Sequence, residues 1–141
     1  MTGAKLADFI AAQDPVYESV VRELSAGRKR THWIWFIFPQ LAVLGQSATS
    51  KRYGLDSKAD AREYFEHPIL GARLKECVGL MLASPGGDIE AIMGYPDDLK
   101  FRSSMTLFAG AVPEEPLFGA ALRKYFNGER DPLTLKLLEG A

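Results

Sequence analysis

The stretch that decides the fold is PDDLKFRSSMTLFAGAV, residues 96–112 of a 141-residue chain. Its large apolar side chains recur at intervals of four, three and four, which is the spacing of one helix face. They are Phe101, Met105, Phe108 and Val112. Pro96 stands at the start, where the missing N–H of proline is tolerated, and Pro113 closes the pattern. The stretch therefore predicts a helix with one buried face.

Similar helix signals recur along the chain. A capping residue precedes proline in three places: Asp14-Pro15, His67-Pro68 and Asp131-Pro132. Ser57 and Asp60 resemble a capping box in which Asp replaces Glu. We expect helices near residues 4–12, 15–26, 57–65, 68–83, 88–93, 96–112, 117–126 and 131–138. The signals predict an all-α fold, a compact orthogonal bundle of about seven or eight short helices, in one globular domain over residues 1–141.

Residues 31–40, THWIWFIFPQ, are the part that helix propensity explains least. Their aromatic and β-branched side chains suit a strand, but a buried short helix fits equally well. Because no strong partner strand is evident elsewhere in the sequence, we expect a buried turn or a short helix. A further small helix is expected over residues 47–53.

Composition excludes several classes of function. Seventeen basic and eighteen acidic residues give a net charge of −1, so we expect no broad nucleic-acid surface. A lone cysteine, Cys77, excludes a disulfide framework, and with only two histidines we expect neither a metal nor a cofactor. The longest purely apolar run, Trp33–Phe38, is too short to span a membrane. We therefore expect a cytoplasmic protein without a membrane partner.

The aromatic run is the first candidate site. It could form a wall on which a base or another flat ligand stacks, with His32 and Gln40 as polar contacts at its edge. For His32 and Trp33, at the entry of the run, a place in the site and a place in the core are equally supported. His32 is the candidate general acid or base, because histidine is the residue type most often used for proton transfer near neutral pH. Three further residues are expected in the core: Trp35, Phe36 and Phe38.

A second candidate lies within the predicted helix of residues 96–112. Lys100 and Ser104 are four residues apart and share a helix face, while Ser103 and Thr106 form a second line three apart. A lysine and three hydroxyls near a helix start suit a phosphate or a carboxylate. The alternative is that these hydroxyls bond back to the preceding turn, as Ser and Thr often do inside helices.

A third candidate is the polar stretch QSATSKRY, residues 46–53, which follows the aromatic run. Ser47, Ser50 and Tyr53 recur at intervals of three and form one line of hydroxyls. Such a line is usually a solvated face. Its position next to residues 31–40 makes Ser47 and Tyr53 candidates for the rim of a pocket.

The string HW-x-WF-x-FPQ at residues 32–40 and the block SSMTLF at residues 103–108 resemble the bacterial family catalogued as domain of unknown function 1810. Supporting matches are Phe9, Ala12-Gln13, Ser47, Tyr53, His67-Pro68, Leu70-Gly71, Arg73-Leu74, Asp98, Lys100, Asp131 and Thr134-Leu135. The resemblance covers essentially the whole chain and implies a mainly α-helical fold, but no activity. Some members carry the label calpastatin. An inhibitor of that kind would be a long disordered chain, whereas this sequence is compact and rich in core residues.

Three functions follow from these candidates. The leading interpretation is a small binding domain whose partner is a small anionic or nucleotide-like ligand, held between residues 31–53 and residues 100–106. The alternative is an enzyme that acts on a nucleotide or an ADP-ribose-like substrate, with His32 as acid or base and Ser103 or Ser104 holding the substrate. A protein–protein interaction module is the third.

Overall fold

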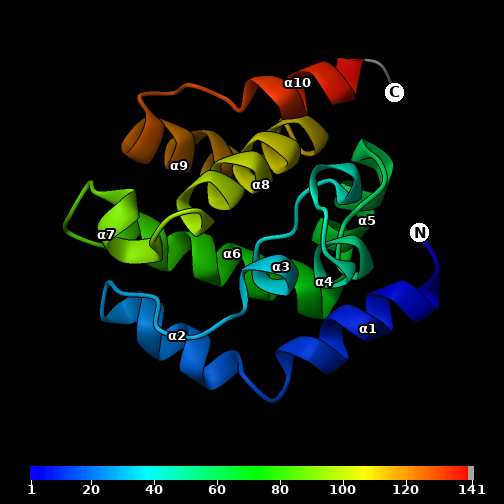
Figure 1. Cartoon of the computed structure of the whole chain (residues 1–141), viewed down its shortest axis with the longest axis horizontal. Helices are drawn as coiled ribbons and strands as arrows, with labels where there is room; N and C mark the ends of the chain where they lie inside the picture. Colours follow the sequence, from blue (N-terminus) through cyan, green and yellow to red (C-terminus); the bar gives the residue numbers. More distant parts are fainter. Residues whose placement is uncertain (140–141) are drawn as a thin grey trace.

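Helix α8 (Asp97–Ala111) runs through the middle of the molecule in the computed structural model, which describes residues 1–139 (Figure 1). The apolar face expected from the sequence is buried: Phe101, Met105, Phe108 and Val112 are each at most 1% exposed. Helices that precede α8 in the chain and helices that follow it pack against α8, so its burial positions many of the other elements.

The described residues form ten α-helices and one 3-10 turn, and no strand. The remaining helices before α8 are α1 (Gly3–Gln13), α2 (Tyr17–Ser25), α3 (Ile34–Ile37), α4 (Ala48–Arg52), α5 (Lys58–Glu66), α6 (Pro68–Ala83) and α7 (Ile89–Met93), and those after it are α9 (Pro116–Phe126) and α10 (Pro132–Glu139). The 3-10 turn is η1 (Ala42–Leu44). The all-α prediction is confirmed. The expected count of seven or eight was low because α3 and α4, of four and five residues, lie where the sequence signal was weakest.

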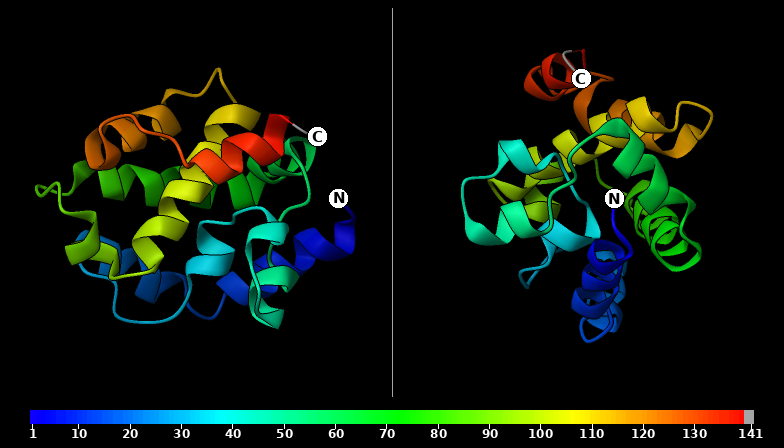
Figure 2. Two further views of the ribbon diagram at one scale, coloured as in Figure 1. Left: turned by 45° about the horizontal axis from the view of Figure 1, so that its top comes forward. Right: turned by 90° about the vertical axis from the view of Figure 1, so that its right-hand side faces the viewer.

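The helices surround one hydrophobic core. Helix α8 packs against α9, α5, α10, α7 and α3, while α6 packs against α9, α5 and α2. Figure 1 and the right-hand view of Figure 2 place α9 and α10 toward one side of the molecule and α1 and α2 toward the other, with α8 between them. The buried hydrophobic side chains from all these layers belong to a single cluster. Among residues 1–139, no helix has the length and apolarity that a bilayer crossing requires.

Most of the helix starts agree with the predicted caps. The side chains of Ser57 and His67 accept hydrogen bonds from the first turns of α5 and α6, and Asp131 does the same for Thr134 in α10. Asp14-Pro15 is the exception, because Asp14 keeps helical dihedral angles and ends α1 instead of beginning α2. Its carboxylate pairs with Arg73, 2.8 Å away, so it cannot cap the next helix.

The aromatic run forms the short helix α3, as expected, and two side chains hold it from outside. Gln13 of α1 donates a hydrogen bond of 2.7 Å to the carbonyl oxygen of Phe36. At the other end, Glu23 of α2 accepts hydrogen bonds from the backbone and side chain of Thr31 and from the indole of Trp33. Since a four-residue helix is not stable alone, these contacts from α1 and α2 fix its place.

Candidate functional site

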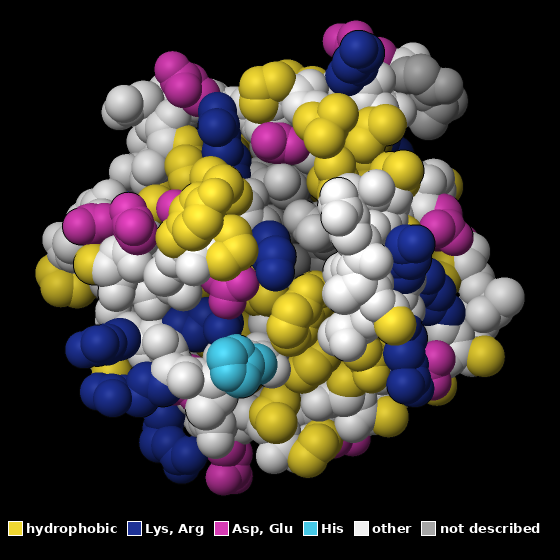
Figure 3. Space-filling view, in the orientation of Figure 1, with side chains coloured by type: hydrophobic (Ala, Val, Ile, Leu, Met, Phe, Trp, Pro, Cys, Tyr) yellow, Lys and Arg dark blue, Asp and Glu magenta, His cyan; other side chains and the backbone are white. Residues whose placement is uncertain are grey.

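Two pockets lie side by side on the face that carries α3, and Trp35 lines both of them. We call them the Tyr95 pocket and the Ser47 pocket, and each has a volume of about 360 Å³. Figure 3 shows this face, where Lys and Arg side chains (dark blue) and a His (cyan) border hydrophobic side chains (yellow) over α3 and the amino end of α8. The shared indole makes the two pockets one candidate site.

The Tyr95 pocket has aromatic and apolar walls with a basic edge. Its lining includes Arg30, His32, Trp35, Met93, Tyr95 and Pro96. Tyr95 stands between α7 and α8 and is 73% exposed, and the side chain of Trp35 is half-buried. An aromatic ring of this exposure beside a second one offers a surface on which a flat ligand can stack.

Asp97, in the first turn of α8, organises the cations of the site. Its carboxylate lies 2.8 Å from the ammonium of Lys29 and 3.6 Å from that of Lys100. The Lys100 ammonium in turn lies 5.0 Å from the ring centroid of Trp35, a cation–π distance. Lys29 is almost fully buried and also donates to the carbonyl of Thr31, so it serves as an internal support. Lys100 lines the Ser47 pocket and lies over the indole that both pockets share.

Amide and hydroxyl side chains line the Ser47 pocket, together with the apolar side chain of Leu44. Gln40, Gln46, Ser47, Ser50 and Lys100 line it together with Trp35. Ser47 caps α4, and the hydroxyls of Ser47 and Ser50 lie 2.8 Å apart in a reciprocal capping box. Gly45 completes this wall, because a Cβ there would lie only 2.2 Å from the Ser50 hydroxyl. Amides and hydroxyls supply donors and acceptors together, which is the chemistry that binds sugar hydroxyls.

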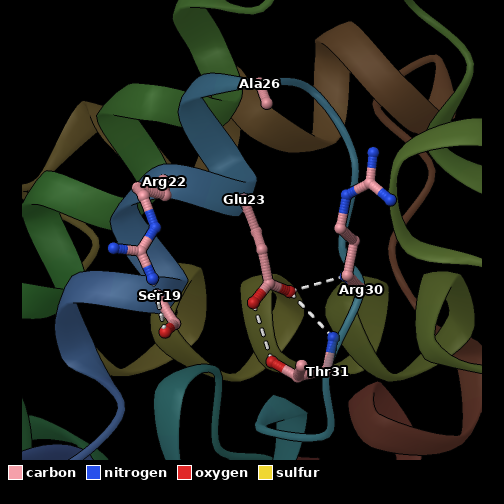
Figure 4. Close-up of a pocket in the computed structure, with 6 residues that line it drawn as sticks. All are labelled: Ser19, Arg22, Glu23, Ala26, Arg30 and Thr31. Atoms are coloured by element: carbon pink, nitrogen blue, oxygen red, sulfur yellow. Dashed lines mark hydrogen bonds between the residues drawn. The ribbon is translucent and has the colours of Figure 1, made fainter.

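Glu23 anchors the loop that carries Arg30 and His32. Figure 4 shows it reaching from α2 to the backbone of Arg30 and to Thr31. Burial alone would raise the pKa of Glu23, but hydrogen bonds from Arg30, Thr31 and Trp33 outweigh that effect and lower it. A third pocket, of about 460 Å³, opens beside Glu23 between Arg22 and Arg30. Because both carboxylate oxygens already accept hydrogen bonds, Glu23 supports the loop and is not free for a ligand.

The structure brings together four of the nine candidate residues. His32 lines the Tyr95 pocket, and Gln40, Ser47 and Lys100 line the Ser47 pocket. The other five lie elsewhere. Trp33 is buried and donates to Glu23. The Tyr53 ring packs against those of Phe9 and Phe36 and lines neither pocket.

The three hydroxyls of α8 point into the protein. Ser103 donates to the carbonyl of Leu99, and Thr106 donates to that of Arg102, as the back-bonding alternative expects. Thr106 also accepts a hydrogen bond of 2.9 Å from the backbone N–H of Asp131 and so fixes the start of α10. Ser104 is fully buried, and its hydroxyl has no hydrogen-bond partner among the described residues. None of the three can reach a ligand in the pockets beside Trp35.

Trp35 and Tyr95 are the site residues that the sequence did not reveal. Trp35 was expected in the core, but it lines both pockets, while Trp33 takes the core position. Trp33 precedes the first turn of α3 and Trp35 lies within it, so the two indoles leave the chain on different sides, and here Trp33 is the one that faces the core. The signal for Tyr95 was its place between Gly94 and Pro96, in a turn where a large ring has little reason to be buried.

Neither a metal site nor an activated cysteine is found among residues 1–139. No three His, Cys, Asp or Glu side chains of this part of the chain gather as metal ligands would. Burial raises the pKa of the Cys77 thiol to about 12, so the thiol is protonated at neutral pH and unreactive.

Comparison with known proteins places the chain in a family. No curated protein matches it. It is similar to the conserved hypothetical protein Rv1873 from Mycobacterium tuberculosis, known from a crystal structure, with 53% sequence identity and a TM-score of 0.93 over 95% of this chain and 96% of that one. The family model described as "Protein of unknown function (DUF1810)" matches residues 3–138. The chain thus belongs to the DUF1810 family.

Proposed function

We propose that the chain is a binding domain for a small anionic or nucleotide-like molecule, held across the two pockets that share Trp35. The observation that carries the proposal is the position of Lys100, which lines the Ser47 pocket and whose ammonium lies over the indole of Trp35, the side chain that both pockets share. The linings of the two pockets contain three cationic side chains and one carboxylate: Lys29, Arg30 and Lys100, and Asp97. This local excess of positive charge favours an anion, although the whole chain is nearly neutral.

A thermal-shift screen with nucleotides, sugar phosphates and ADP-ribose tests the proposal. A ligand that binds only the folded state stabilises it by about 2.7 kcal/mol at one hundred times its Kd, which raises Tm by several degrees. We expect Lys100→Gln to abolish the shift. Lys75→Gln is the matched control, because Lys75 also lies over an aromatic ring, that of Phe65, but lines neither pocket. If no anion raises Tm, or if both variants respond like the wild type, the proposal is wrong.

Catalysis is a second candidate function, favoured by the place of His32 in the Tyr95 pocket beside Arg30. There its imidazole could transfer a proton to or from a bound nucleotide or ADP-ribose-like substrate. The test is to incubate the protein with whichever compound the screen identifies and to follow product formation by phosphorus NMR. Turnover that His32→Ala abolishes while binding persists supports an enzyme. Binding without turnover by the wild-type protein supports a binding domain and contradicts the enzyme.

We also propose that the protein resides in the cytoplasm. A chain whose one cysteine, Cys77, is a buried free thiol inside α6 suits a reducing compartment.

A further inference from the structure

The two pockets beside Trp35 differ in chemistry, and we infer that they receive different parts of one ligand. That ligand is a nucleoside phosphate, with its base in the Tyr95 pocket and its sugar phosphate in the Ser47 pocket. This inference rests on the proposed function and adds to it the class of the ligand and its orientation.

Two rings without an aromatic partner point to a flat ligand group in the Tyr95 pocket. Ring pairs join most of the aromatic side chains among residues 1–139, but neither Trp35 nor Tyr95 belongs to any of them. Both rings line the same pocket, together with the apolar side chains of Met93 and Pro96. A nucleobase has a π face whatever its identity, so stacking on these two rings accepts any of the bases.

Polar groups suit the sugar phosphate in the Ser47 pocket. The amides of Gln40 and Gln46 can donate to and accept from ribose hydroxyls. The Ser47 hydroxyl donates to Ser50 and accepts from its backbone N–H, so it can only accept from a ribose hydroxyl. Lys100 lines the Ser47 pocket and lies over the shared indole, where it can contact a phosphate while the base stays in the Tyr95 pocket. Asp97 holds that ammonium in place from the α8 side.

Size supports a ligand that spans both pockets. Each pocket has about 360 Å³, which is near the lower end of the roughly 300–1,000 Å³ typical of small-molecule sites. One pocket suits a base or a sugar phosphate alone. A complete nucleotide uses both, and the shared indole of Trp35 gives it a continuous wall.

The test compares AMP, UMP, adenosine and ribose 5-phosphate as probes, by calorimetry and by tryptophan fluorescence. We expect the two nucleotides to bind at least tenfold more tightly than adenosine or ribose 5-phosphate, and to change the emission of Trp35. Tyr95→Ala is expected to weaken AMP binding about tenfold, the lower part of the range for loss of one stacking partner, and to leave ribose 5-phosphate binding unchanged. Lys100→Gln is expected to weaken both. Because Tyr95 is 73% exposed, its variant should keep the wild-type Tm.

The outcomes separate this inference from the proposed function. If ribose 5-phosphate binds as tightly as AMP, or if Tyr95→Ala leaves AMP binding unchanged, the base does not occupy the Tyr95 pocket and the inference is wrong, while an anion site still stands. If none of the probes and no other anion binds, the proposed function fails and the inference fails with it.

Discussion

Ser104 brings an unpaired hydroxyl into the core, and this has a measurable consequence for stability. A buried hydroxyl without a partner costs free energy, and alanine is the better helix former. We therefore expect Ser104→Ala to raise the free energy of unfolding by about 1 kcal/mol and to leave ligand binding unchanged. Urea unfolding at pH 7 measures the first, and calorimetry with AMP measures the second.

Thr106→Val is the matched comparison in the same helix. Thr106 is equally buried, but its hydroxyl donates to Arg102 and accepts from the backbone of Asp131. Removing the hydroxyl leaves the partly buried N–H of Asp131 unpaired, so we expect the free energy of unfolding to fall by about 1–3 kcal/mol. If Ser104→Ala destabilises as much as Thr106→Val, the Ser104 hydroxyl has a partner and is not a source of strain.

Glu23 makes stability depend on pH. Its pKa is lower in the folded protein than the ordinary value of 4.5, because of the hydrogen bonds that offset the cost of its burial. The ionised Glu23 carboxylate therefore contributes fully to the free energy of unfolding above about pH 4.5, and this contribution is lost as the pH falls through the pKa of the folded protein. We expect Glu23→Gln to cost about 1–3 kcal/mol at pH 7, since charge-assisted hydrogen bonds are replaced by neutral ones. Urea unfolding at pH 7 and at pH 3 should show this difference shrinking in acid.

Glu18→Gln provides the control for Glu23, on the same helix. Glu18 is exposed in the first turn of α2, so we expect its replacement to change stability by no more than about 0.5 kcal/mol. A Glu23→Gln variant that matched this control at pH 7 would show that the loop of residues 30–33 is held by other contacts.

At the scale of elements, two glycines of α6 should respond in opposite ways to the same substitution. A Cβ on Gly71 would lie 1.9 Å from the carbonyl oxygen of Phe65, a backbone atom at the end of α5 that cannot move aside. A Cβ on Gly79 would meet nothing within 4 Å. We expect Gly71→Ala to lower the free energy of unfolding by about 1–3 kcal/mol. Gly79→Ala should raise it by about 0.4–1 kcal/mol, because alanine reduces the conformational freedom of the unfolded chain. Thermal unfolding of the two variants measures both, and equal shifts in Tm would contradict the close packing of α5 on α6.

Elements differ in how far the sequence could predict them. The starts of α5, α6 and α10 follow from local signals, since Ser57, His67 and Asp131 cap the turn that comes directly after them. Helix α3 depends instead on Gln13 and Glu23, which lie ten or more residues away in sequence from the groups of Phe36 and Trp33 that they bind. Local sequence patterns do not report such long-range contacts. For that reason the sequence alone could not decide whether residues 31–40 form a strand, a turn or a short helix.

The same distinction applies to the candidate site. Lys100 and Ser47 could be selected because their residue types and their neighbours suit an anion. The exchange of roles between Trp33 and Trp35 could not be predicted, because it depends on which indole finds the Glu23 carboxylate. For Ser103 and Thr106, spacing placed both hydroxyls on helix faces but could not show that those faces turn inward.

At the scale of the whole molecule, the single buried cluster predicts that the chain unfolds as one cooperative unit. Phe108 tests this, because its ring lies 5.4 Å from that of Phe118 in α9 and 5.7 Å from that of Tyr64 in α5. We expect Phe108→Ala to lower the free energy of unfolding by about 3–5 kcal/mol, a large part of the roughly 5–15 kcal/mol of a typical domain. Far-UV ellipticity reports all the helices, whereas tryptophan fluorescence reports only Trp33 and Trp35 around α3. Both probes should give one midpoint in the wild type and shift together in the variant, because α3 packs on α8 as α9 and α5 do. A fluorescence transition that kept its wild-type midpoint in Phe108→Ala would show that the region around Trp35 folds independently of the core behind it.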